Sequence, residues 1–187
     1  MKLIVAMSGS SGVAYGVRLV EVLKTLKIET HLIMSKWAEE CIEIETERKP
    51  SYVKALANYI YSNDDLAASP SSGSFRIDGM VVIPCSMKTL ASIANGYEDT
   101  LIARSASVTL KESRKLVIVP RETPLTAIHL SNMLTLARMG TIILPAMPGF
   151  YHKPKSIEDL LNHIAGKILD QFGVEHEVFN RWTGIKL

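Results

Sequence analysis

The first sixteen residues, MKLIVAMSGSSGVAYG, constrain the fold more than any other stretch of this sequence. The apolar run at 3–7 predicts a strand, and the small residues at 8–12 predict a tight turn. From Val17 onward apolar residues recur at helical spacing, which predicts an amphipathic helix. The chain therefore opens with a strand–turn–helix unit, which is the start of a parallel α/β sheet.

The turn of this unit has the composition of a ligand-binding loop. Gly9 and Gly12 let the backbone bend sharply and approach a ligand closely. Ser8, Ser10 and Ser11 can cap the new helix and place hydroxyls beside its unpaired N–H groups. A helix start of this kind attracts anions, phosphate above all. By itself the turn leaves two interpretations open, a phosphate site and a simple tight connection.

The rest of the chain alternates strands with helices. We expect strands at 29–34, 79–84, 115–119 and 141–144, and helices at 35–44, 51–61, 86–94, 101–113, 126–138 and 156–172. The segment 63–75, rich in Ser, Ala, Asp and Pro, is the least regular. This alternation predicts a doubly wound, mostly parallel α/β sheet with helices on both faces, and the length predicts a single domain over residues 1–187.

Composition excludes several classes of protein. A net charge of +2 with both signs interspersed argues against nucleic-acid binding. Cys41 and Cys85 form no CxxC motif, so they indicate neither a zinc site nor a disulfide framework, and they fit a reducing cytoplasm. No apolar run reaches membrane-spanning length. We therefore expect a soluble cytoplasmic protein that binds no membrane.

The residues that follow the predicted strands indicate a binding site, because ligands of open α/β sheets gather beyond the carboxyl ends of the strands. Small, hydroxylated and charged side chains occupy these strand ends at 8–12, 35–36, 85–86, 120–122 and 145–151. Arg121 stands between two prolines, a rigid placement with no obvious packing purpose. Glu122 beside it is a candidate for proton transfer or an ion-pair partner.

Two further cations lie on one predicted helix. Arg104 and Lys111 are seven residues apart and share a face, two turns from each other. With Arg121 they suit a phosphate dianion, although the helix pair could equally form an ordinary solvated face. The tempting residues Cys85, His129 and His152 belong to no metal or nucleophile motif, so we expect Cys85 to pack in the core and the histidines to make structural hydrogen bonds.

Six motifs together resemble the flavin prenyltransferase family, formerly described as aromatic-acid decarboxylases. They span nearly the whole chain: GSSG, SSGS, PCSMKTLASIANG, RSASVTLKE, PRETPLTAIHLSNMLTL and LPAMPGFYHKP. The resemblance implies a flavodoxin-like Rossmann fold and a large homo-oligomer, commonly a dodecamer, with active sites at subunit interfaces. It also implies transfer of a dimethylallyl group from dimethylallyl monophosphate to N5 and C6 of reduced FMN. The prenylated FMN would then serve separate decarboxylases.

The resemblance also assigns roles to individual residues. It implies catalytic roles for Ser11, Glu45 and Glu122, with Glu45 near the reacting edge of the flavin. FMN contacts are implied for Gly9, Ser10, Ser11, Ser35, Ser86, Met87, Thr89 and Arg121. The donor phosphate would meet Arg104, Lys111, Arg121, Tyr151 and Lys167. Lys167 stands where relatives often carry arginine, which keeps the charge but loses the bidentate fork. Leu66 stands where some members carry tryptophan.

The chemistry implied requires stabilisation of a departing phosphate and of an allylic cation. The chain has no DDxxD motif, only Asp64 and Asp65, so we expect Arg, Lys and Tyr donors to replace metal and the reaction to be metal-independent. Trp182 could help the flavin ring stabilise the cation, or pack structurally. Two alternatives stay open: an FMN-dependent peptidyl-cysteine decarboxylase and a non-catalytic FMN carrier. The sequence leaves open a diphosphate donor, and whether the product serves ubiquinone biosynthesis or aromatic acid decarboxylation.

Overall fold

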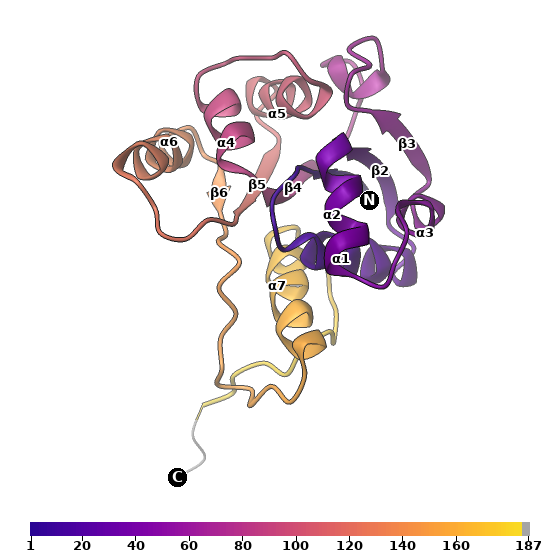
Figure 1. Cartoon of the computed structure of the whole chain (residues 1–187), viewed down its shortest axis with the longest axis vertical. Coiled ribbons are helices and arrows are strands. Elements are labelled where there is room, and N and C mark those ends of the chain that lie inside the picture. Colours follow the sequence, from indigo (N-terminus) through magenta and orange to yellow (C-terminus); the bar gives the residue numbers. More distant parts are fainter. Residues whose placement is uncertain (185–187) are drawn as a thin grey trace.

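A single parallel sheet forms the centre of the computed structural model, which describes residues 1–184 (Figure 1). Its strands are β1 (Lys2–Met7), β2 (Glu29–Met34), β3 (Tyr59–Ser62), β4 (Gly79–Cys85), β5 (Lys115–Pro120) and β6 (Ile142–Ile143). Their order is β3-β2-β1-β4-β5-β6, and every neighbouring pair within the described residues is parallel. The prediction of a doubly wound α/β sheet is confirmed.

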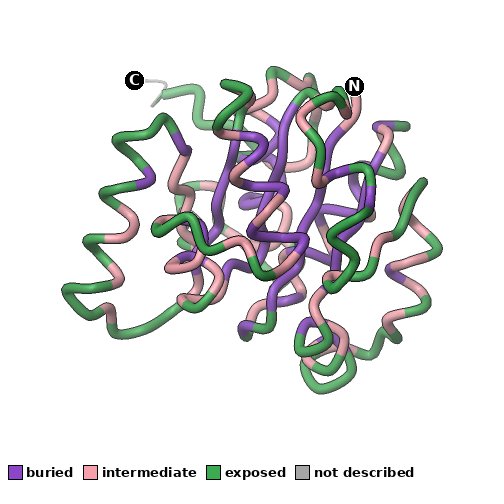
Figure 2. Tube along the Cα trace, turned by 90° about the horizontal axis from the view of Figure 1, so that it is seen from above, coloured by how far each residue is buried: buried purple, intermediate pink, exposed green. Residues whose placement is uncertain are grey.

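The apolar runs in the sequence occupy the middle of this sheet. All residues of β4 are buried, as are all but the first residue of β1 and of β5. A parallel strand covered by helices on both faces must be apolar on both sides, and these runs meet that requirement. Figure 2 shows the buried strands as a central layer between more exposed helices.

Helices cover both faces of the sheet. They are α1 (Val13–Thr25), α2 (Lys36–Glu45), α3 (Pro50–Leu56), α4 (Met87–Ala94), α5 (Leu101–Lys111), α6 (Ala127–Arg138) and α7 (Ile157–Gln171), with a short 3-10 turn at Ser69–Ser71. One apolar core joins the sheet to α1, α2, α3 and α7, and a second core on the other face joins it to α4, α5 and α6. The two faces of the sheet are therefore covered by different sets of helices.

The strand order places a switch point between β1 and β4. From β1 the chain goes to β2 and β3 on one side, and it then returns to build β4, β5 and β6 on the other. Without the edge strand β3 the order is that of flavodoxin-like sheets. Ligands of such folds bind beyond the carboxyl ends of the strands at this switch point. The turn after β1 and the loop after β4 are thus the first places to examine for a site.

Two predicted elements differ from the structure. A helix was predicted at 51–61, but α3 ends at Leu56 and β3 follows. Asn58 lies between them and redirects the chain, because its side chain accepts a hydrogen bond from the Thr30 amide at 2.9 Å and its own amide donates to the Thr30 carbonyl at 3.0 Å. The last strand, expected over 141–144, is only Ile142–Ile143. No helix within residues 1–184 is long and apolar enough to span a membrane.

Candidate functional site

The turn after β1 is fixed to the loop after β4 by the buried hydroxyl of Ser8. This hydroxyl donates to the Pro84 carbonyl at 2.9 Å and accepts from the Ser86 amide at 2.8 Å. Ser8 is only 2% exposed, so water cannot replace these bonds at low cost. One serine therefore sets the distance between the two loops at the switch point.

The loop after β5 joins the same assembly through Arg121. Its guanidinium Nε donates to the Ser11 carbonyl at 2.9 Å, and the Ser10 hydroxyl donates to the Arg121 carbonyl at 3.0 Å. The Arg121 amide also donates to the Cys85 carbonyl at 3.3 Å. The loops after β1, β4 and β5 therefore form one hydrogen-bonded rim, as the strand-end residues predicted.

The carboxylate of Glu45, the last residue of α2, lies at the N-terminus of α1. Its Oε2 accepts hydrogen bonds from the amides of Gly12 at 2.7 Å and Val13 at 3.3 Å. Gly12 is the residue that precedes the helix, with a φ of 92°, and no side chain of the turn caps it. The expectation that a serine at 8–11 caps α1 is therefore wrong, because a carboxylate from the end of α2 satisfies these amides instead.

A cavity of about 190 Å³ opens beside this rim. The residues that precede three helices line it: Ser35 before α2, Ser86 before α4 and Thr100 before α5. Each of these side chains caps its own helix, accepting from a backbone amide at 3.1 to 3.4 Å. Three positive helix ends thus converge on one cavity, an arrangement that suits an anion.

The other residues of the cavity fit a flavin nucleotide. Gly9 approaches α2 so closely that a Cβ there would lie 2.2 Å from the Cβ of Trp37. The Ser86 hydroxyl donates to the Thr89 hydroxyl at 3.1 Å, and the lining holds one cation, Lys88, and one carboxylate, Asp99. The volume lies below the roughly 300–1,000 Å³ of complete ligand pockets, so a whole FMN molecule would extend beyond this cavity. The residues present fit the phosphate and the polar chain of that cofactor.

Four other residues named from the sequence do not line this cavity. Met87 is the first residue of α4 and packs against the core. Glu122 is exposed and accepts from the Thr123 amide at 3.1 Å. Cys85 is fully buried, as expected of a packing residue, and burial raises the pKa of its thiol well above the usual range. His129 completes a capping box with Thr126 at the start of α6, so its predicted structural role is confirmed.

Tyr151 and Lys167 form a second group around α7. Tyr151 lies in the loop of residues 144–156, and its hydroxyl is 3.2 Å from Nε2 of His163. The C-terminal tail, which we define as residues 173–184, runs back beside α7 (Figure 1). Its Trp182 stands edge-on to the Tyr151 ring, at 6.0 Å between centroids, and is 60% exposed. Trp182 is therefore available to a ligand near Tyr151.

Asp170 holds this tail in place. Arg181 binds the Asp170 carboxylate with two hydrogen bonds, at 2.6 and 3.1 Å, and His176 contacts it at 3.2 Å. The hydrogen bond from Arg181 is the main reason that the pKa of Asp170 lies below its usual value. Lys167 stands 3.7 Å from the same carboxylate and is half exposed, so its ammonium can still meet an anion.

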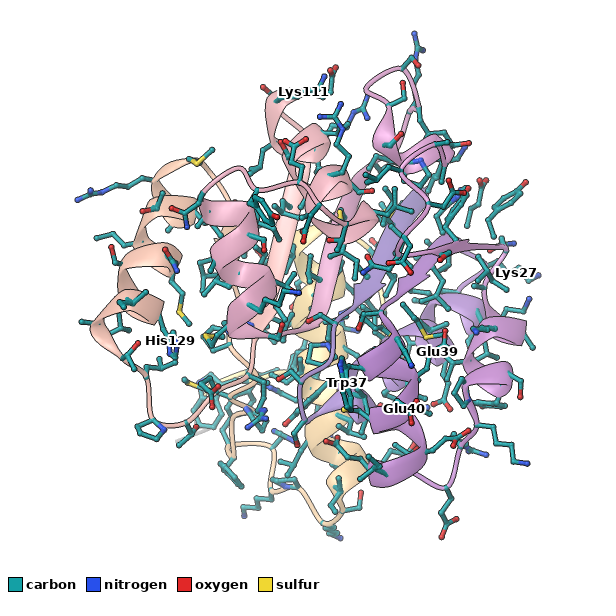
Figure 3. The ribbon with its side chains drawn as sticks, turned by 45° about the horizontal axis from the view of Figure 1, so that its top comes forward. Lys27, Trp37, Glu39, Glu40, Lys111 and His129 are labelled. Atoms are coloured by element: carbon teal, nitrogen blue, oxygen red, sulfur yellow. The ribbon has the colours of Figure 1, made fainter. Side chains whose placement is uncertain are left out.

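Arg104 and Lys111 form a third group, on α5. Arg104 donates to the Ser71 carbonyl at 3.0 Å and pairs with Glu98 at 2.6 Å, while Lys111 pairs with Glu112. Hydrogen bonds from Ser107 and then Arg104 hold the pKa of Glu98 below its usual value. Figure 3 shows Lys111 at the top of the view, well away from Trp37, which lies near the centre. The two cations share a helix face, as predicted.

The five predicted phosphate-binding residues thus lie in three groups: Arg121 at the switch point, Tyr151 and Lys167 around α7, and Arg104 and Lys111 on α5. Helices α5 and α7 belong to the cores on opposite faces of the sheet. One chain therefore does not bring α5 and α7 together around one phosphate.

Sequence reasoning missed two residues of this site, Thr100 and His163, and misjudged the roles of Ser8 and His152. Ser8 and Thr100 lack a motif that distinguishes them from ordinary serine and threonine, and their roles depend on contacts between loops distant in sequence. His163 lies inside α7, about two turns from its start, and belongs to no motif in the sequence. His152 was expected to make hydrogen bonds, but among the described residues both its ring nitrogens are buried without a partner, and the ring stacks on His163 at 5.2 Å.

Comparison with known proteins gives matches over nearly the whole chain. The family described as Flavoprotein matches residues 1–169. A probable UbiX-like flavin prenyltransferase of Escherichia coli O157:H7 is 54% identical over 186 residues, covering 99% of this chain and 94% of the relative. The crystal structure described as a dodecameric FMN-dependent Ubix-like decarboxylase from the same organism has a TM-score of 0.96 and 54% identity, covering 98% of this chain and all of that one.

A second structure is described as AnUbiX (PadA1) in complex with FMN and dimethylallyl pyrophosphate. It has a TM-score of 0.97 and 52% identity, and the match covers 99% of this chain and 98% of that one. An FMN-dependent cysteine decarboxylase, SpaF, matches with a TM-score of 0.64 at 17% identity, which shows a shared fold alone. The comparisons therefore do not favour the peptidyl-cysteine decarboxylase alternative.

Proposed function

The chain belongs to the flavoprotein family and, within it, to the flavin prenyltransferases, and on this premise we propose that it prenylates FMN. A dimethylallyl group passes from dimethylallyl monophosphate to N5 and C6 of reduced FMN, and inorganic phosphate leaves. The prenylated FMN then serves a separate decarboxylase as cofactor. This reaction needs the anion-binding cavity for FMN and the cations of the rim for the donor phosphate. A simple FMN carrier would need only the cavity.

The observation that carries this proposal is the attachment of the β5 loop to the β1 turn. Arg121 reaches across to the Ser11 carbonyl and so holds the β5 loop, with the exposed carboxylate of Glu122, at the switch-point rim. A cation and a proton-transfer group beside a flavin are what departure of an allylic phosphate requires. The match to a structure described with FMN and dimethylallyl pyrophosphate supports the same assignment.

FMN itself binds, in this proposal, with its phosphate at the ends of α2, α4 and α5. Ser35, Ser86 and Thr89 supply hydroxyls there, Met87 lies beside them, and Gly9 lets the β1 turn approach. Ser10 and Ser11 contact FMN from the turn after β1. Bound FMN supplies the nucleophilic ring atoms and a π surface that stabilises positive charge on the five-carbon fragment.

Glu45 is the proposed proton acceptor near the flavin. The Gly12 and Val13 amides hold its carboxylate beside the β1 turn, which fixes its position. Glu122 is the proposed group that transfers a proton to the leaving phosphate. The positive charges of Arg121 and Lys167 offset the phosphate charge without a metal ion, and the Tyr151 hydroxyl donates a hydrogen bond to it.

Arg104 and Lys111 complete the phosphate site from a neighbouring protomer. They lie on the face of the sheet opposite α7, so a site that contains all five donors needs two chains. We propose a homo-oligomer, a dodecamer like the relative from E. coli, with the active sites at its subunit interfaces. The Glu98 and Glu112 partners that hold these cations in one chain orient them before the donor binds.

We place the reaction in the cytoplasm. The acceptor is reduced FMN, and Cys41 and Cys85 are both free thiols, which favours a reducing compartment.

Phosphate release tests the proposed reaction. The full-length protein is incubated without oxygen, in EDTA, with reduced FMN and dimethylallyl monophosphate, and inorganic phosphate and unmodified FMN are both measured. We expect one phosphate released for each FMN consumed, and at least about a hundredfold loss in Glu122→Gln. Release of phosphate without loss of FMN would indicate a phosphatase, and no release with both ligands bound would indicate a carrier.

A further inference from the structure

His163, on α7, lies directly behind the phenol of Tyr151. The Tyr151 hydroxyl is 3.2 Å from its Nε2, and the Gly149 amide donates a hydrogen bond to its Nδ1 at 3.3 Å. The imidazole is only 6% exposed, whereas Tyr151 is 44% exposed. One ring therefore contacts two points of the 144–156 loop, and the loop presents the tyrosine to solvent.

These two contacts determine which nitrogen carries the proton. A backbone amide can only donate, so Nδ1 of His163 must offer a lone pair to Gly149. In the neutral ring the proton is then on Nε2, and this N–H donates to the Tyr151 oxygen. Because the phenol oxygen is the acceptor, the hydrogen of the Tyr151 hydroxyl is not used within this pair.

The surroundings of His163 favour this neutral form. Burial is the main reason that the pKa of His163 lies below its usual value, and nearby His152 and Lys167 lower it further, while Asp170 opposes them. The His152 ring stacks parallel on it, and the Phe179 ring meets it edge-on at 4.9 Å. Protonation would also point an Nδ1–H at the Gly149 amide, so the contact that holds the loop would be lost.

We propose that His163 is a positioning residue that aims the hydroxyl hydrogen of Tyr151 at the phosphate of the donor. Donation from Nε2 orients the phenol and polarises its O–H, which strengthens the hydrogen bond that the phenol gives to an anion. The inference rests on the proposed function, because it takes Tyr151 as a phosphate-binding residue. It adds a histidine that touches neither substrate and acts through its neighbour.

Two substitutions separate positioning from packing. In His163→Gln the side-chain amide nitrogen replaces Nε2 and can still donate to Tyr151, whereas in His163→Asn the side-chain oxygen replaces Nδ1 and reaches only Gly149. We expect His163→Asn to raise the KM for dimethylallyl monophosphate about tenfold, as Tyr151→Phe does, and His163→Gln to stay within about threefold of the wild type. The KM for reduced FMN should not change in any of the three.

A double variant gives a further check. If His163 acts through Tyr151, then Tyr151→Phe/His163→Asn should be no worse than Tyr151→Phe alone. Additive losses in the double variant, or equal losses in His163→Gln and His163→Asn, would overturn the inference and leave His163 a packing residue.

A spectroscopic measurement tests the inference apart from the reaction. Nitrogen NMR of the full-length oligomer, labelled with ¹⁵N-histidine and assigned with His163→Gln, distinguishes the two neutral tautomers and the cation. We expect a neutral His163 with its proton on Nε2 at pH 7.5. A proton on Nδ1, or a cation, would overturn the inference even if prenyl transfer is observed. If no prenyl transfer occurs in the wild type, the proposed function fails, whatever the tautomer.

Discussion

The connection between the β1 and β4 loops depends on one hydroxyl, so Ser8→Ala is the substitution that probes the site most simply. The change removes the acceptor of the Ser86 amide at 2.8 Å and the donor to the Pro84 carbonyl at 2.9 Å. The Pro84 carbonyl keeps the Ser8 amide as a partner at 3.2 Å, but the Ser86 amide loses the hydroxyl it donates to. The loss is therefore mainly one part-buried N–H, beside the cavity, that is left without its partner.

A buried donor without a partner costs about 1–3 kcal/mol. For a chain of this size each kcal/mol lowers the Tm by about 2–4 °C, so we expect Ser8→Ala to lower it by roughly 2–12 °C. Because Ser86 also lines the anion-binding cavity, we expect weaker binding of FMN as well. Thermal and urea unfolding at one fixed protomer concentration measure the loss of stability, and titration of flavin fluorescence measures FMN binding.

Ser51→Ala is the matched control, since Ser51 is an exposed serine in the first turn of α3. It should change the free energy of unfolding by no more than about 0.5 kcal/mol. If Ser8→Ala is as stable as this control and binds FMN like the wild type, the hydroxyl does not hold the two loops together, and our description of the site is wrong.

Three further predictions concern the tail, the buried histidines and catalysis. A Cβ at Gly166 would lie 2.3 Å from the Phe179 ring, so Gly166→Ala should displace the C-terminal tail and speed its cleavage by trypsin at least severalfold. Burial holds the pKa of His31 and His163 below their usual 6.5, so the unfolded chain binds protons more readily. The Tm should therefore be highest above about pH 6.5 and fall as pH drops, and His31→Gln should flatten this fall. Glu45→Gln keeps an acceptor but loses the charge, so prenyl transfer should fall at least about a hundredfold with FMN affinity retained. Equal turnover in the variant would contradict the role of Glu45.

The sequence was sufficient to predict most of the sheet, because its central strands are continuous apolar runs of the kind that parallel sheets bury on both faces. It was not sufficient for β3. The residues YIYS at 59–62 have high strand propensity, but the segment is only four residues long and begins only three positions after the last residue of α3. What makes it a strand is its pairing with β2 from His31↔Tyr59 to Met34↔Ser62, a contact that no local pattern contains.

The candidate site was predicted to the level of loops but not of contacts. Strand-end rules located the rim, and the motifs named Arg121, Glu122 and Tyr151. The bonds that assemble the rim connect residues up to 111 positions apart, such as Ser10 with Arg121, so their partners depend on strand order rather than on local sequence. Likewise, the resemblance named Glu45, but its contact with the start of α1 depends on how α2 packs against that helix.

The mass of the flavin released after reaction tests the central claim most directly. The full-length protein is incubated without oxygen, in EDTA, with reduced FMN and dimethylallyl monophosphate, and the released flavin is analysed by mass spectrometry. A parallel reaction with the diphosphate distinguishes the donor. We expect a flavin heavier by one C5H8 unit with the monophosphate, formed by the wild type and lost in Arg121→Ala. Unmodified FMN, under conditions where both ligands are shown to bind, would contradict the account.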